Sequence, residues 1–110
     1  MTQIIPIAVE VAAGADTFVE LYTVEDAKVR IKEIELHFPA GAMNYVFLSL
    51  YYGNMKKAPR TGEWTGDNGK IKDFPDITYY RGDTILLRAR NTHTTDSFKV
   101  WGTLELEKVG

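Results

Sequence analysis

The sequence predicts an all-β protein, a single-domain β-sandwich of about seven or eight antiparallel strands. Seven segments show the two-residue alternation or the dense aromatic and β-branched content of strands, and turn-forming residues separate most of them. A length of 110 residues with 45% hydrophobic content fits one domain, spanning 1–110, with a single core. The expected strands are 3–11, 16–23, 28–38, 44–52, 77–80, 84–91 and 97–108.

The segment 97–108 shows the clearest strand pattern. Its apolar residues, from Phe98 to Leu106, alternate with mainly polar ones, which predicts one core face and one solvent face. Trp101 lies in the polar phase of this alternation. Because a large ring on the outer face of a strand is costly to leave in water, Trp101 is expected at a covered face or an interface.

Two other segments have features that place them in the sheet. In 44–52 both faces are apolar, so this strand should be central or covered by a neighbouring subunit. The first segment, 3–11, contains Pro6, which has no backbone N–H to donate to a ladder. It is therefore expected to be an edge strand or a bulged arm.

The segment 28–38 supports two interpretations. Val24, Ala27, Ile31, Ile34 and Phe38 recur at spacings of three and four, as on a helix. The same stretch also alternates as two strand runs whose phase changes at residues 32–33, which a β-bulge would produce. The β-branched residues and the all-β surroundings favour the bulged strand.

The stretch 53–75 is predicted to be one long irregular loop. It holds four of the nine glycines and two of the four prolines, and loops of this length are often functional or ordered by a partner. Lys56, Lys57 and Arg60, followed by Trp64, are candidates for a small basic and aromatic surface that would bind phosphate, an anionic sugar or an acidic partner. Trp64 either packs under the loop or faces a ligand or neighbour.

Several kinds of chemistry have no support in the residues. The chain has no cysteine, which excludes thiol and cysteine-based metal chemistry. His37 and His93 lack the spacing of a metal site, and neither Ser49 nor Ser97 lies in a Gly-x-Ser-x-Gly turn. No catalytic residue, metal ligand or cofactor is predicted, so the chain is not expected to be an enzyme.

Short acidic motifs in the second half are interpreted as turns. Asp67, Asn68, Asp73 and Asp76 do not have the spacing of a calcium loop, and Asp67-Asn68-Gly69 is typical of a turn. The tripeptide 81–83, Arg-Gly-Asp, stands between two expected strands, where a tight turn requires such residues.

Charge and hydropathy restrict the expected partners. Thirteen basic and fifteen acidic side chains give a net charge of −2, which argues against non-specific binding of nucleic acid. No apolar run approaches the length of a membrane span, and the first fifteen residues do not match a secretory signal. Arg88 and Arg90 are expected to pair across the ladder with Glu105 and Glu107 of the neighbouring strand.

Three stretches, 29–41, 45–52 and 82–91, resemble small jelly-roll-like β-sandwich proteins of phage and archaeal virus particles. The resemblance implies a structural role as a capsid-decorating, spike or tail-associated subunit, often a symmetric oligomer. It also implies a location in a virion or another assembled particle, or otherwise in the cytoplasm.

The leading hypothesis is therefore a non-enzymatic structural subunit that binds copies of itself or other particle proteins, without a membrane or a specific nucleic acid. The alternative is a carbohydrate-binding module, in which Trp64, Tyr79 and Tyr80 stack on a glycan and Asp67 and Asn68 bond its hydroxyls. The candidate residues for partner or ligand binding are Trp64, Trp101, Lys56, Lys57, Arg60, Asp67, Asn68, Tyr79 and Tyr80.

Overall fold

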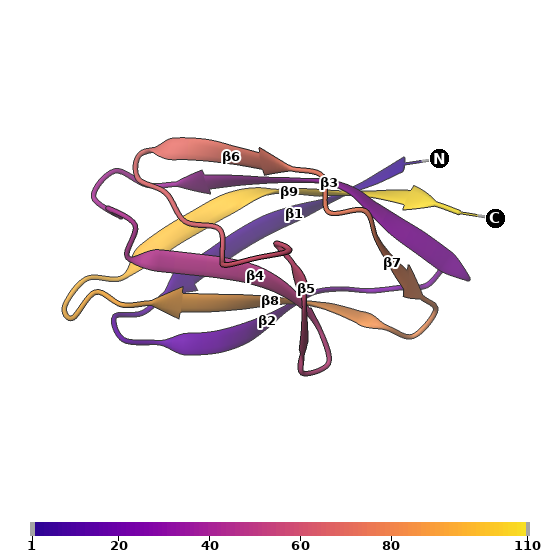
Figure 1. Ribbon diagram of the computed structural model, residues 1–110, viewed down its shortest axis with the longest axis horizontal. Helices are drawn as coiled ribbons and strands as arrows, with labels where there is room; N and C mark the ends of the chain where they lie inside the picture. Colours follow the sequence, from indigo (N-terminus) through magenta and orange to yellow (C-terminus); the bar gives the residue numbers. More distant parts are fainter. Residues whose placement is uncertain (1, 110) are drawn as a thin grey trace.

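The computed structural model describes residues 2–109 and consists of strands arranged in two layers (Figure 1). This confirms the predicted all-β sandwich. No helix long and apolar enough to cross a membrane occurs in the described part of the chain. Within residues 2–109 the strands are β1 (Thr2–Val11), β2 (Asp16–Thr23), β3 (Lys28–Phe38), β4 (Val46–Tyr52), β5 (Met55–Ala58), β6 (Gly69–Asp73), β7 (Ile77–Tyr80), β8 (Thr84–Asn91) and β9 (Phe98–Lys108).

The strand pairings are nested along the chain. β1 pairs with β9, β2 with β8, β3 with both β6 and β7, and β4 with β5, all antiparallel. The chain is thus one long hairpin, and the additional pairs β3–β9 and β4–β8 fold it into two sheets. Sheet A has the order β1-β9-β3-β6 with β7 also on β3, and sheet B has the order β2-β8-β4-β5. This is a jelly-roll arrangement.

The core lies between the two sheets and is made by the inward-facing phase of each strand. In β3 this phase includes Val29 and Ile31, then Ile34 and Leu36, all almost fully buried. The ladder between β3 and β9 shifts register between Ile31 and Glu33, which is the predicted bulge. The extra residue lets both apolar runs face the core, so the bulged strand is correct and the helical alternative is wrong.

The expected positions of two strands in the sheets are confirmed. β4 lies between β8 and β5, and its inward residues, Val46, Leu48 and Leu50, are buried. The outward Phe47 and Tyr51 are half-buried. β1 is an edge strand of sheet A that pairs with β9 alone, and Pro6 is exposed there.

The stretch 53–75 is not the irregular loop predicted from its glycines and prolines, because it contains β5 and β6. β6 extends sheet A against β3, from Ile34↔Asp73 to Phe38↔Gly69. In the segment that connects β5 to β6, Trp64 forms two backbone hydrogen bonds with Leu48 of β4, one in each direction and both 2.8 Å long. These pairings use main-chain groups, which carry no side-chain signature in the sequence.

The predicted turns are confirmed by their backbone geometry. In the turn at 81–83, the Asp83 N–H donates to the Tyr80 carbonyl at 2.9 Å, and the Asp83 carboxylate accepts from the Tyr80 N–H at 2.8 Å. Gly82 has a φ of 90° there. In the other turn, Asn68 has a φ of 46° and Asp67 accepts a hydrogen bond from the Gly41 N–H at 3.1 Å.

Candidate functional site

The outer face of sheet B combines aromatic rings with arginines. Residues paired directly across an antiparallel ladder share a face. The pairs Phe18↔Arg88, Phe47↔Arg90 and Tyr51↔Leu86 therefore gather on the side of sheet B that points away from the core. We call this surface the aromatic–arginine face and define it by Phe18, Phe47, Tyr51, Leu86, Arg88 and Arg90.

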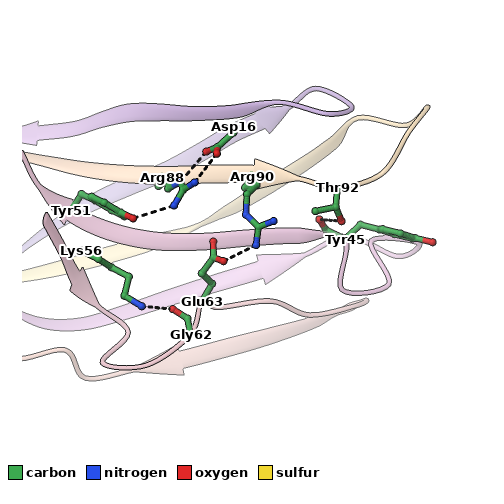
Figure 2. Close-up of polar contacts among 9 residues, drawn as sticks. All are labelled: Asp16, Tyr45, Tyr51, Lys56, Gly62, Glu63, Arg88, Arg90 and Thr92. Atoms are coloured by element: carbon green, nitrogen blue, oxygen red, sulfur yellow. Dashed lines mark hydrogen bonds and ion pairs between the residues drawn. The ribbon is translucent and has the colours of Figure 1, made fainter. Parts of the chain in front are cut away.

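Arg88 is fixed on this face by three hydrogen bonds (Figure 2). Its Nε and Nη2 donate to the two carboxylate oxygens of Asp16 at 2.8 and 2.6 Å, a bidentate pair. Its Nη1 donates to the Tyr51 hydroxyl at 3.2 Å. The hydrogen bond from Arg88 lowers the pKa of Asp16, and the same bond raises the pKa of Arg88.

Arg90 ties the face to the segment that follows β5. Its Nη2 donates to Oε1 of Glu63 at 2.7 Å (Figure 2), and its guanidinium carbon lies 4.5 Å from the centre of the Phe47 ring. A second aromatic contact joins Phe18 and Tyr51, whose ring centres are 5.0 Å apart in an edge-on arrangement. The rings and guanidinium groups are therefore held in place before any partner arrives.

The two arginines do not pair with Glu105 and Glu107, and that prediction is wrong. β8 lies in sheet B and β9 in sheet A, because the connection between them crosses from one sheet to the other. Glu107 instead accepts a hydrogen bond from Arg30 of β3 at 2.7 Å. The short spacing of the two strands in the sequence is typical of a hairpin, but the nested pairing gives each strand another neighbour.

The larger hollows of the molecule lie away from the aromatic–arginine face. Four hollows, of about 370, 350, 290 and 170 Å³, are lined entirely by residues outside the set that defines the face. Phe18 is 51% exposed, and the other five residues are half-buried. Small ligands bind in concave pockets, whereas the centres of protein interfaces are enriched in aromatic residues and arginine. The geometry therefore suits a protein partner.

Trp64 and Tyr79 are core residues. Trp64 is 6% exposed, and its Nε1 donates to Asp73 at 2.9 Å. Tyr79 is fully buried and donates to the Tyr51 carbonyl at 3.1 Å, and burial raises the pKa of Tyr79 to about 12. Of the two interpretations of Trp64, packing under the loop is correct. Neither ring can stack on a glycan, and only Tyr80 of the three proposed aromatics is exposed.

The basic residues of the segment are exposed but have a different aromatic neighbour from the one expected. Lys56 donates to the carbonyl of Gly62 at 2.8 Å (Figure 2). Lys57 and Arg60 line the hollow of about 290 Å³ together with Phe74, which is 64% exposed. Phe74 was not predicted as a site residue, because nothing in its local sequence distinguishes an exposed ring from a buried one.

Trp101 points outward from sheet A, as its phase in the sequence predicts. It is 47% exposed and stacks on His37, with ring centres 5.7 Å apart and planes 11° from parallel. The two rings line the hollow of about 370 Å³ with Asn68 and Lys70. Trp101 and Asn68, two of the candidate residues, are thus brought together. Asp67 does not line this hollow, and residues 2–109 contain no cluster of acidic or histidine side chains that could hold a metal ion.

The Asp16–Arg88 pair predicts a dependence of stability on pH. The pKa of Asp16 is below its ordinary value of about 3.9, so the pair stabilises the fold fully above that pH and loses this contribution as the pH falls through the lowered pKa. Asp16→Asn removes the titrating group. Urea unfolding should show wild type more stable by less than about 1 kcal/mol near neutral pH, with a difference that shrinks as the pH falls below the ordinary pKa of an aspartate. A difference independent of pH would contradict this assignment.

Comparison with known proteins shows the fold but no family. No family model matches the chain, and no curated protein matches its sequence. A chain from Bacillus endospore appendages, described as a novel family of disulfide-linked pili, is 11% identical with a TM-score of 0.50, covering 99% of this chain and 89% of the other. A chain from the acidic stable capsid of Helicobacter pylori bacteriophage KHP30 is 10% identical with a TM-score of 0.55, covering 97% and 94%.

Proposed function

We propose that this chain is a non-enzymatic structural subunit that associates with copies of itself in an assembled particle, such as a virion. The aromatic–arginine face carries the proposal. A surface of rings and ordered arginines has the composition of an interface, where such residues contribute most of the binding energy.

The ion pairs of the face favour binding in two ways. Arg88 and Arg90 are already ordered by Asp16 and Glu63, so a partner that covers them does not have to order these long side chains. Their charges are also already matched, which lowers the cost of removing them from water compared with unpaired guanidinium groups. A partner therefore gains the apolar contact of Phe18 and Tyr51 at a reduced cost.

The solved structures that share the fold support the same role. One comes from an appendage and the other from a capsid, and both are assembled from protein subunits. The fold alone does not determine function, so the proposal depends on the surface of this chain rather than on the likeness.

Native mass spectrometry and light scattering across a range of micromolar concentrations test the proposal. We expect wild type to form oligomers and Phe18→Ser to raise the dissociation constant about tenfold or more, because it removes an exposed ring at the edge of the face. Met43→Ser, in the loop between β3 and β4, is the control because Met43 is also exposed. A wild-type protein that stays monomeric at every concentration would contradict the proposal.

A further inference from the structure

The two edges of sheet B carry opposite charge. Residues 2–27, which include β1 and β2, contain five acidic residues and no lysine or arginine. Residues 53–62, which include β5, contain three cationic residues and no acidic one. β2 and β5 are the two edge strands of sheet B, so the topology places these two strands on opposite sides of that sheet, while β1 is an edge strand of sheet A. The acids are Glu10, Asp16, Glu20, Glu25 and Asp26, and the cations are Lys56, Lys57 and Arg60.

Several of these charges have no partner within the described molecule. Glu20 and Glu25 make no ion pair with any residue in 2–109, and the same holds for Lys57 and Arg60. All four residues are exposed. The two edges are therefore free to attract a charged surface of the opposite sign.

Each edge also exposes apolar side chains beside its charges. Phe18 lies on β2, and Tyr52 and Met55 pair with each other across β4 and β5. All three side chains are exposed. We define the acidic edge by Phe18, Glu20 and Glu25, and the basic edge by Tyr52, Met55, Lys57 and Arg60.

The strand directions fit contact between unlike edges. Sheet B has four strands, each antiparallel to the next, so β2 and β5 run in opposite directions. A second copy placed beside the first in the same orientation brings its β2 antiparallel to β5. Contact between two basic edges is disfavoured, since lysines on an edge strand block pairing with an identical edge. Contact between two acidic edges is disfavoured because their like charges repel each other.

We infer that copies of this chain associate head to tail, with the basic edge of one copy against the acidic edge of the next. This inference rests on the proposed function and specifies the surfaces and the symmetry of the assembly. A head-to-tail contact uses two different surfaces, so it produces a ring when the rotation closes and a filament when it does not. A two-fold dimer would instead use the same surface twice.

Charge reversal tests the inference. Lys57→Glu/Arg60→Glu makes both edges acidic, and Glu20→Lys/Glu25→Lys makes both edges basic. We expect each double variant to weaken self-association at least tenfold in sedimentation velocity runs at low salt. An equimolar mixture of the two double variants should regain association, and so should the quadruple variant, because both arrangements restore contact between unlike edges. Recovery in the quadruple variant also shows that the substituted chains fold.

The control is Lys32→Glu, which reverses an exposed charge on β3 in sheet A, away from both edges. It should leave association unchanged. If wild type associates but the edge variants behave like this control, the head-to-tail inference is overturned and the proposed function stands. If the two double variants weaken association but the mixture and the quadruple variant do not regain it, the inference is also overturned. If wild type does not associate at all, both the inference and the proposed function fail.

Discussion

Gly102→Ala is expected to lower the free energy of unfolding by about 3 kcal/mol, one of the two largest effects of a single substitution expected in this protein. Gly102 lies in β9 and pairs with Ile7 on one side and Leu36 on the other. A Cβ at this position would overlap the backbone carbonyl of Glu35 and lie 3.1 Å from the Leu36 Cα. β3 cannot move aside, because β6 and β7 hold its other edge.

Urea and thermal unfolding measure this effect. A loss of about 3 kcal/mol corresponds to a fall in Tm of about 12 to 24 °C in a domain of this size. Gly69→Ala in β6 is the control, because the nearest atom to a Cβ there is the Asp67 carbonyl oxygen at 3.5 Å, an ordinary contact. It should cost less than about 1 kcal/mol. Equal losses in the two variants would show that the approach of β9 to β3 is not tight.

Trp64→Ala is expected to cost about 3 to 5 kcal/mol. The side chain is buried in the core, its Nε1 bonds to Asp73 at the end of β6, and its backbone bridges to Leu48 of β4. The residue therefore connects the segment after β5 to both sheets. Its removal should leave a cavity and release that segment from the sandwich.

Hydrogen exchange of the amides in β5 and β6, together with urea unfolding, checks this expectation. Trp64→Phe keeps most of the ring and loses the bond to Asp73, so it should cost only about 1 to 2 kcal/mol and leave the exchange rates near those of wild type. If Trp64→Ala also leaves the exchange of β5 and β6 unchanged, Trp64 does not anchor the segment.

The two surfaces proposed for association have different electrostatic roles. On the aromatic–arginine face, Arg88 and Arg90 are neutralised by Asp16 and Glu63, so this face adds little to the long-range field. At the edges of sheet B, Glu20, Glu25, Lys57 and Arg60 make no ion pair within residues 2–109. Charges of this kind mainly set the orientation and rate of encounter, whereas buried rings set the lifetime of a contact. The rate of association should therefore fall as the salt concentration is raised, because exposed charges are screened.

The alternation of side chains by itself determined which residues face the core. The alternation in β9 predicted its inner face and the outward Trp101, and the phase change in β3 predicted a bulge at residues 32–33. Pro6 placed β1 at an edge. These properties depend on the backbone period and on residues close in the chain, so they are visible without knowledge of the neighbouring strands.

Only the tertiary structure decided which strands are neighbours. The partners of Arg88 and Arg90, the burial of Trp64 and the strand β6 all depend on contacts between residues distant in the sequence. The absence of lysine and arginine before Lys28 is evident in the sequence, but its meaning comes from the fold, which places β2 and β5 on opposite edges of one sheet. The periodicity of the sequence indicates on which face of its strand a side chain lies, whereas the order of the strands in a sheet is set by the packing of the whole chain.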